Sequence, residues 1–361
     1  MKFDVAIIGS GPAAGAAAGY LAATGLKVVL LEQYELPRPK PCGGLVPEAT
    51  LAVLAQDVSA LVGNRVVDRR YSYQNTLPHA SHTPDSALAL VDRASFDAGL
   101  VQGAISAARG SIVLQEGFRV TEVMETEAQV EIRGARGQWV TARFAIAADG
   151  AASRTARCLA LNPRRVNAVG IDTEVRVSEE CYRRFATAVL FDYFCLPCGY
   201  GWVFPKGDCV LSVGVASWRK SVDCKAAMSN YLSHHFSKRD LLSSIHRAYP
   251  IPVYNGQAPI ATRRVCLAGD AASLVDPVTG EGIRFALYSG MSAARTICDI
   301  ITKADGEGAE PGDCRLYQQR IYNGMSQPLE ALHRFATLPF MEAPEYYYRR
   351  FVTGGEAKAY Q

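Results

Sequence analysis

Residues 3–33 read FDVAIIGSGPAAGAAAGYLAATGLKVVLLEQ, and this stretch decides the fold of the chain. An apolar run, Val5 to Ile8, breaks into a glycine-rich turn, and an Ala-rich segment of helix-forming residues follows. A second apolar run, Lys27 to Leu31, ends on Glu32. Strand, glycine turn, helix, strand and acid in this order are typical of the βαβ unit that opens a Rossmann-type α/β domain.

The small residues of this turn are suited to nucleotide binding. Gly9 allows the tight turn, and Gly11 lets the backbone approach a pyrophosphate at the helix N-terminus. Ala14 takes the third glycine position, where close packing of helix on strand needs a small residue. Glu32 is expected to bind ribose hydroxyls, and an acid there disfavours a 2′-phosphate. The sequence therefore predicts a dinucleotide site, against the plainer alternative of an Ala/Gly-rich βαβ unit with no ligand.

The composition is that of a globular enzyme. The chain has 361 residues, of which 49% are hydrophobic and 20% charged, and its net charge of +3 is too small to argue for nucleic acid. We find no apolar stretch of about 18 residues, the length that a membrane-spanning helix needs. The first strand begins at once, leaving no room for a signal peptide, and the ten cysteines are scattered. We expect reduced thiols in a cytoplasmic protein.

Four later motifs decide between a nicotinamide and a flavin. An apolar strand ends in Gly269-Asp270, where the acid is placed to hold a ribityl hydroxyl of FAD. The turn Gly280-Glu281-Gly282 opens a helix, and the positive end of that helix suits the N1–O2 edge of a flavin. Asp149-Gly150 again leads from a strand into a turn, and Arg93 opens a helix, where it is offered to phosphate or adenosine. Together the motifs favour FAD.

In this order the motifs resemble those of the FAD-dependent oxidoreductases of the p-hydroxybenzoate hydroxylase structural class. The resemblance covers roughly residues 2–305. It implies an α/β fold: a Rossmann-type FAD-binding domain, an inserted, mainly antiparallel β-sheet substrate domain and a short helical C-terminal segment. The implied FAD domain is discontinuous, with residues 1–68, 91–165 and 256–310. The substrate domain takes residues 69–90 and 166–255, and the helical tail takes residues 311–361.

The resemblance also implies which residues contact FAD. They come from the glycine turns, from the ends of strands and from one loop near residue 42. The implied FAD-binding residues are Gly9, Gly11, Pro12, Ala13, Ala14, Glu32, Gln33, Cys42, Gly43, Gly44, Arg93, Val120, Asp149, Gly150, Gly269, Asp270, Pro277, Gly280, Glu281, Gly282 and Ile283.

Two further motifs narrow the class. In Pro37–Gly44, prolines stiffen a loop that glycines let approach another group closely. Its Pro-x-Cys-Gly-Gly pattern resembles the geranylgeranyl reductase family, in which this loop borders the isoalloxazine ring; the alternative is a buried thiol in a tight loop. In Gly199–Gly207, alternate aromatics share one face of a strand, and the stretch resembles the Tyr-x-Trp-x-Phe-Pro-Lys motif of the same family. Plain sheet core is the alternative there. Where that family often shows Gly-x-Gly, this chain has Gly214-Val-Ala216.

The leading hypothesis is an FAD-dependent reductase of C=C bonds in a prenyl or other apolar substrate, with hydride from N5 of reduced FAD. NADPH or another electron donor would bind transiently. The catalytic candidates are Cys42, Tyr200, Trp202 and Glu281; Glu281 is either a proton donor or only a helix-start acid. We expect no metal site. The pair His234-His235 is predicted to lie on a solvated helix face, and Cys195 and Cys198 to be two thiols at a strand bend.

The sequence leaves two alternative functions open. A flavin monooxygenase or halogenase-like enzyme would attack an aromatic substrate through a C4a-hydroperoxide, and Tyr200-Gly-Trp202 is a partial echo of the halogenase Trp-x-Trp motif. A flavoprotein that modifies a partner protein would use the tail and the open sheet for docking. The basic, aromatic stretch Tyr346 to Phe351 either rests on a membrane surface, as a peripheral contact, or packs on the protein.

Overall fold

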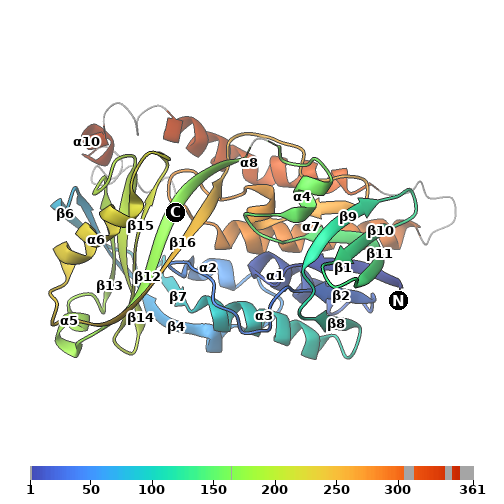
Figure 1. Ribbon diagram of the computed structural model, residues 1–361, viewed down its shortest axis with the longest axis horizontal. Helices are drawn as coiled ribbons and strands as arrows, with labels where there is room; N and C mark the ends of the chain where they lie inside the picture. Colours follow the sequence, from blue (N-terminus) through green and yellow to red (C-terminus); the bar gives the residue numbers. More distant parts are fainter. Residues whose placement is uncertain (1, 164, 305–312, 338–343, 350–361) are drawn as a thin grey trace.

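The computed structural model describes residues 2–163, 165–304, 313–337 and 344–349. Its two larger β-sheets lie at opposite ends of the molecule (Figure 1). Two long helices, α7 (Ile283–Ala304) and α8 (Arg315–Thr337), run beside the N-terminal sheet (Figure 1).

The N-terminal sheet follows from the apolar runs of the sequence. Its order is β8-β2-β1-β11-β10-β9, with β17 beside β11. The strands β8, β2, β1, β11 and β17 are parallel, while β9 and β10 join β11 as an antiparallel meander. Buried parallel strands read as continuous apolar runs, as in Val28–Leu31, where every residue is buried. The bounds are β1 (Lys2–Ile8), β2 (Val28–Leu31), β8 (Ile112–Gln115), β9 (Val120–Glu125), β10 (Val130–Gly134), β11 (Trp139–Ala147) and β17 (Val265–Leu267).

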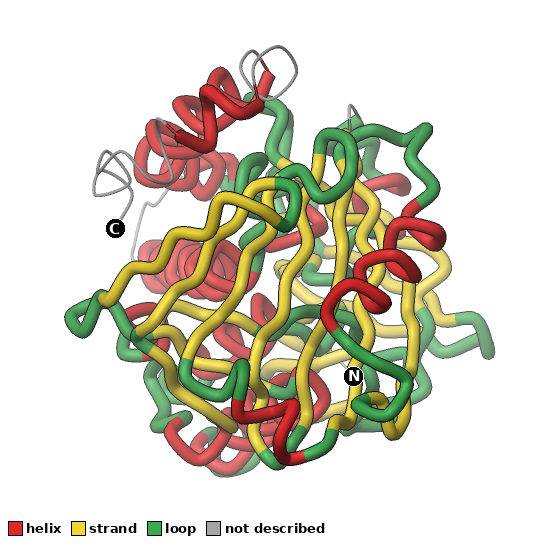
Figure 2. The backbone as a smooth tube through the Cα atoms, turned by 90° about the vertical axis from the view of Figure 1, so that its left-hand side faces the viewer, coloured by secondary structure: helices red, strands yellow, loops and turns green. Residues whose placement is uncertain are grey.

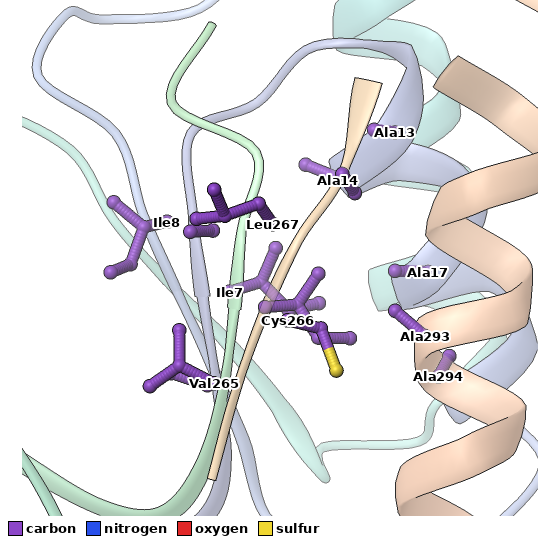
Figure 3. Close-up of a cluster of buried hydrophobic side chains, with 14 of the residues drawn as sticks. Ile7, Ile8, Ala13, Ala14, Ala17, Val265, Cys266, Leu267, Ala293 and Ala294 are labelled. Carbon is purple, nitrogen blue, oxygen red and sulfur yellow. The ribbon is translucent and has the colours of Figure 1, made fainter. Parts of the chain in front are cut away.

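The Ala-rich helix α1 (Pro12–Leu21) packs between this sheet and α7. The side chains of Ala13, Ala14 and Ala17 lie near those of Ala293 and Ala294 on α7 and near the apolar strand residues (Figure 3). The approach is so close that a Cβ on Gly290 of α7 would lie 2.0 Å from the carbonyl oxygen of Ala13. Small residues are therefore required where α1 and α7 pack together. This packing fixes the position of α1 directly after the glycine turn.

The second sheet is mainly antiparallel and has the order β16-β12-β15-β14-β13-β5-β6 (Figure 2). Only the β13–β5 pair is parallel. One face is covered by α6 (Cys224–His235), and the other carries the aromatic residues of β14 and meets the small sheet described next. The bounds are β5 (Asp68–Tyr73), β6 (Thr76–His82), β12 (Val166–Val177), β13 (Ala188–Tyr193), β14 (Gly199–Gly207), β15 (Val210–Ser217) and β16 (Leu241–Val253).

A small third sheet joins the two larger ones. Its strands are β3 (Leu45–Pro47), β7 (Leu88–Val91) and β4 (Val62–Val66), in the order β3-β7-β4. Short helices α2 (Glu48–Leu51) and η1 (Ser59–Leu61) lie between its strands along the chain, and β7 leads into α3 (Arg93–Ala107). Because residues 37–44 enter β3 directly, this sheet fixes the C-terminal end of the proline-rich loop.

The C-terminal segment is helical and is packed where the structure describes it. After α8, the short helix α10 (Pro344–Tyr347) brings Tyr348 against Tyr73 and Tyr193, with ring centroids 5.6 and 6.2 Å apart. Tyr348 is only 1% exposed, so this part of the predicted basic, aromatic stretch does not face solvent. The side chains of Tyr346 and Tyr347, and residues 350–361, lie outside the described residues. The predicted fold is confirmed: a Rossmann-type domain, an inserted, mainly antiparallel sheet and a short helical C-terminal segment.

Candidate functional site

The turn after β1 leaves room for a ligand at the start of α1. Gly9 has a φ of +97°, and a Cβ there would lie 2.4 Å from the carbonyl oxygen of Ala148. Gly11 faces open space, since the nearest atom to a Cβ there is Nη2 of Arg38, at 3.9 Å. Pro12 occupies the first turn of α1, and no side chain of the described residues caps this helix. The first backbone N–H groups of α1 are therefore available to an anion such as a pyrophosphate.

Glu32 lies beside this turn, at the end of β2. Its Oε2 accepts a hydrogen bond from the Ser10 hydroxyl at 2.5 Å, and its Oε1 accepts one from the Tyr34 backbone N–H at 2.9 Å. The Nε of Arg38 lies 3.4 Å from Oε2 and donates to the Ser10 hydroxyl at 3.2 Å. Glu32 is 3% exposed. The acid predicted for ribose hydroxyls is thus in place, and Arg38 adds a cation that sequence reasoning missed.

Arg93, which was predicted to contact phosphate or adenosine, is buried at the start of α3 and pairs with an acid one turn further on. Its Nε and Nη2 donate to the two carboxylate oxygens of Asp97, both at 2.9 Å, and its charge also interacts with the Cys42 thiol. Burial would lower the pKa of Arg93, but Asp97 and Cys42 outweigh it and raise that pKa. The guanidinium is therefore held beside Cys42. Of the two arginines, Arg38 is the one that reaches the Gly11 turn.

Asp149 and Asp270 end two neighbouring parallel strands, β11 and β17. Asp270 belongs to the short helix η2 (Gly269–Ala272), and its Oδ1 would lie 3.6 Å from a Cβ on Gly282. Oδ2 of Asp149 accepts hydrogen bonds from the N–H and hydroxyl of Thr155, both at 3.0 Å. Oδ1 of Asp149 is buried and has no hydrogen-bond partner among the described residues. Carboxylates at the ends of adjacent parallel strands suit a polar ligand across that edge.

Arg165 hydrogen-bonds to both segments that follow β11 and β17, a contact that the sequence did not predict. Its Nη1 donates to the carbonyl oxygen of Ala151 at 2.7 Å, and its Nη2 donates to that of Ala271. Burial lowers the pKa of Arg165, and the charges of Asp149 and Asp270 oppose that shift. Arg165 follows another arginine in the segment before β12, and this local pattern gives no sequence signal for such a bridge.

Two acids of the glycine turn before α7, Asp276 and Glu281, bind groups in and beside that turn. Oδ1 of Asp276 accepts from the backbone N–H groups of Val278 and Thr279, at 2.7 and 3.2 Å. Oε2 of Glu281 pairs with Nη2 of Arg284 at 2.9 Å, while its Oε1 is buried and has no hydrogen-bond partner among the described residues. Burial raises the pKa of Glu281 to about 7, Arg284 opposes this rise, and Asp276 adds to it. Glu281 can therefore hold or release a proton near neutral pH.

The aromatic residues of β14 meet both loops that were predicted to border a flavin. Tyr200 donates its hydroxyl proton to the carbonyl oxygen of Thr279 in the glycine turn, at 2.5 Å. A Cβ on Gly43 would lie 2.9 Å from the Phe204 ring and 3.3 Å from Nε1 of Trp202. All three rings are buried on one face of the sheet. The sheet therefore covers the space between the two loops with an aromatic wall.

Trp202 also begins a buried polar chain that sequence reasoning missed. Its indole lies across Gly214, where a Cβ would be 2.0 Å from Cζ2. Its Nε1 donates to the Ser212 hydroxyl at 3.1 Å, and that hydroxyl donates to Oδ1 of Asp172 at 2.7 Å. Oδ2 of Asp172 accepts from the backbone N–H of Cys42 at 3.3 Å. β12 carries two acids at alternate positions, Asp172 and Glu174, and this pattern by itself does not show that Asp172 is the buried one.

The remaining predicted residues flank these groups. Pro277 and Ile283 are buried on either side of the glycine turn. Gln33 is exposed next to Glu32, and Val120 is the first residue of β9. The predicted residues of the Gly9–Ala14 turn thus form one group with Glu32, and those of the Cys42 loop (residues 37–44) and of the turn before α7 form another through the β14 rings.

One prediction outside this site was wrong in part. His234 is exposed, but His235 is packed inward, with Nε2 lying 2.9 Å from Oδ2 of Asp192, which also accepts from the Tyr231 hydroxyl at 2.6 Å. The buried acid draws the imidazole off the solvated face. Cys195 and Cys198 lie in the bend between β13 and β14, as predicted, and neither is in a disulfide. No group of metal-binding side chains was found among the described residues.

These features fit FAD. The uncapped start of α1, the buried acid Glu32 and a buried carboxylate oxygen of Asp149 with no partner among the described residues lie along one edge of the N-terminal sheet. They define a dinucleotide-binding flavoprotein. The FAD-binding domain family matches residues 2–310. The chain belongs to this family and, within it, to the geranylgeranyl reductase-like FAD-dependent oxidoreductases.

Reductases of this class are among the similar proteins. The chain is 30% identical over 317 residues to a digeranylgeranylglycerophospholipid reductase of Methanopyrus kandleri, a match that covers 84% of this chain and 83% of the relative. The crystal structure of a geranylgeranyl bacteriochlorophyll reductase-like protein from Thermoplasma acidophilum is 23% identical, has a TM-score of 0.82, and matches over 98% of this chain and 91% of its own. A flavin-dependent brominase has a TM-score of 0.75 at 17% identity, over 100% of this chain and 92% of its own. The fold alone is thus shared with halogenases, and the sequence relatives favour a reductase.

Among the helices that the structure describes, none is long and apolar enough to cross a membrane.

Proposed function

We propose that this protein reduces C=C bonds of a prenyl or other apolar substrate between its aromatic sheet face and the flavin loops. The observation that carries the proposal is the wall formed by Tyr200, Trp202 and Phe204, which contacts both the Cys42 loop and the turn before α7. Apolar rings so placed exclude water from the space that a flavin ring would share with the substrate. The sequence relatives that act on geranylgeranyl lipids support the same substrate class.

In this proposal the cofactor is held in two places. The adenosine and pyrophosphate half lies on the Gly9–Ala14 turn, with Glu32 on the ribose and Arg38 beside the phosphates. The ribityl and ring half lies along Asp149 and Asp270 toward the turn before α7. Residues 1–68, 91–165 and 256–310 then form the FAD domain, residues 69–90 and 166–255 the substrate domain, and residues 311–361 the tail.

Reduced FAD supplies hydride from N5 when it is bound. The alkene carbon that does not receive hydride needs a proton, and Glu281 is the acid that we assign to this task. Its Oε1 is buried and has no hydrogen-bond partner among the described residues, and its raised pKa, about 7, keeps a large fraction protonated at neutral pH. Arg284, which pairs with Oε2, holds the carboxyl in place and stabilises it once the proton has left.

The apolar substrate is proposed to lie along a further set of rings on the same sheet. Tyr71 stacks on Phe191 with ring centroids 5.9 Å apart, and Phe191 contacts Phe204 at 5.1 Å. Tyr193 continues this set to Tyr348 of the C-terminal segment. A hydrocarbon would follow these rings away from the flavin.

Electron supply and membrane contact are further parts of the proposal. The chain has one dinucleotide fingerprint, which FAD takes, so NADPH or another donor is proposed to bind transiently. A lipid substrate is collected from a membrane surface, and we propose a peripheral contact for that step.

An anaerobic reaction tests the proposed function. The FAD-loaded protein is reduced, mixed with a geranylgeranyl lipid in detergent, and followed by flavin absorbance and by mass spectrometry of the lipid. We expect flavin oxidation to match the gain of two hydrogen atoms per double bond. Flavin that stays reduced with the lipid but is oxidised rapidly by oxygen, with modification of an aromatic compound, would establish the monooxygenase or halogenase alternative. Reaction only with a protein substrate would establish the third.

A further inference from the structure

The Cys42 loop is anchored at two points, by different means. Its C-terminal end is fixed to β7, because Gly44, at a φ of +73°, accepts a hydrogen bond from the Val91 backbone N–H at 2.8 Å. Nearer its middle, the Cys42 N–H donates to Oδ2 of Asp172 on the seven-stranded sheet, at 3.3 Å. The Asp172 bond therefore ties the loop backbone to the substrate face of the molecule.

The surroundings of Asp172 are unusual for an acid. The residue is 4% exposed, and a carboxyl buried to that degree is costly unless hydrogen bonds compensate it. Each of its oxygens has one donor: the Ser212 hydroxyl and the Cys42 N–H. Burial raises the pKa of Asp172, Ser212 and Lys206 oppose the rise, and Glu174 adds to it. An apolar side chain would fill the same space with a smaller desolvation cost. The carboxyl is therefore explained by the two hydrogen bonds that it accepts, from Ser212 and from Cys42.

We propose that Asp172 is a positioning residue that clamps the Cys42 loop to the sheet and so holds the Cys42 thiol beside Arg93. Ser212 orients the carboxyl, and Trp202 orients Ser212 through its indole N–H, so the aromatic wall and the loop are set by one polar chain. The place of this loop beside the flavin rests on the proposed function, while the clamp itself does not. Loss of the clamp frees the loop at Cys42 while its end at Gly44 stays attached.

The test measures how fast iodoacetamide alkylates Cys42 in the FAD-loaded protein. After timed quenching and digestion, mass spectrometry reads each cysteine peptide separately. Cys158, which is exposed, reports the intrinsic reaction, and Cys266, which is fully buried, reports global unfolding. The variants are Asp172→Ala, which removes both acceptors, and Asp172→Asn, whose amide oxygen can still accept from the Cys42 N–H while its NH2 donates to Ser212.

In Asp172→Ala we expect alkylation of Cys42 to rise about tenfold or more, because a hydrogen bond to a charged group is worth roughly 1.5–3 kcal/mol. The rates at Cys158 and Cys266 should stay unchanged, and Asp172→Asn should restore the slow rate at Cys42. An unchanged Cys42 rate in Asp172→Ala overturns the proposal, as does an Asn variant that reacts as fast as the Ala variant.

If Asp172→Ala unfolds, alkylation of Cys266 reveals it, and Asp172→Ser replaces it, since the serine hydroxyl is polar but too short to bridge to the loop. The same rise at Cys42 is expected, and its absence overturns the proposal. None of these readouts uses a substrate. A slow rate restored by Asn together with no lipid reduction would therefore leave the clamp standing and refute the proposed function alone.

Discussion

Glu281→Gln tests the electrostatics of the turn before α7. Burial raises the pKa of Glu281 from the ordinary 4.5 to about 7, so the folded protein holds this proton more tightly than the unfolded chain does. Stability is then lost as pH rises from the unfolded pKa through the folded one. The shift of about 2.5 pKa units, 7 minus 4.5, corresponds to about 3 kcal/mol at 1.36 kcal/mol per unit. Glutamine is uncharged at every pH and is free of this loss.

The assay is urea unfolding of the flavin-free protein at about pH 5 and about pH 8. We expect the two proteins to differ by less than about 1 kcal/mol at the lower pH and Glu281→Gln to be more stable by up to about 3 kcal/mol at the higher pH. Glu179→Gln is the matched control, because Glu179 also begins a helix and pairs with an arginine, Arg183, but is 71% exposed. A difference between Glu281→Gln and the parent protein that does not change with pH would refute the reasoning.

Three further outcomes are expected. Gly214→Ala places a methyl group 2.0 Å from the Trp202 indole and should cost about 1–3 kcal/mol of unfolding free energy with a shift in tryptophan fluorescence; an unshifted spectrum contradicts the packing. Tyr200→Phe loses the bond to the turn carbonyl, and urea unfolding should show a cost of about 0.5–1.5 kcal/mol; no loss would mean that the bond does not form. Glu32→Ala should weaken FAD binding at least about tenfold in a fluorescence titration, while exposed Glu35→Ala should not; equal affinities would remove Glu32 from the site.

The fold could be predicted because its decisive signals are local. The Gly9–Ala14 turn and Glu32 lie within one βαβ unit, where strand length, turn chemistry and helix packing all agree. The aromatic alternation of β14 likewise fixes a face without knowledge of its neighbours. The confirmed class rests on these patterns and on the order of the later glycine motifs.

The missed residues depend on contacts between distant segments. Asp172 and Cys42 are 130 positions apart, and Arg165 meets Ala271 across 106 positions, so neither contact is visible in local spacing. In the sequence, Arg38 is only one residue of a proline-stiffened loop. The structure shows that this loop brings the Arg38 side chain to the Gly11 turn. His235 was misread because its acid partner, Asp192, comes from a different element.

The most direct test of the central claim is a single anaerobic turnover with a geranylgeranyl lipid and protein-bound reduced FAD. We expect flavin oxidation and lipid saturation to proceed at the same rate, with two hydrogen atoms gained per double bond. A lipid that is recovered unchanged, with the flavin still reduced, would contradict the claim.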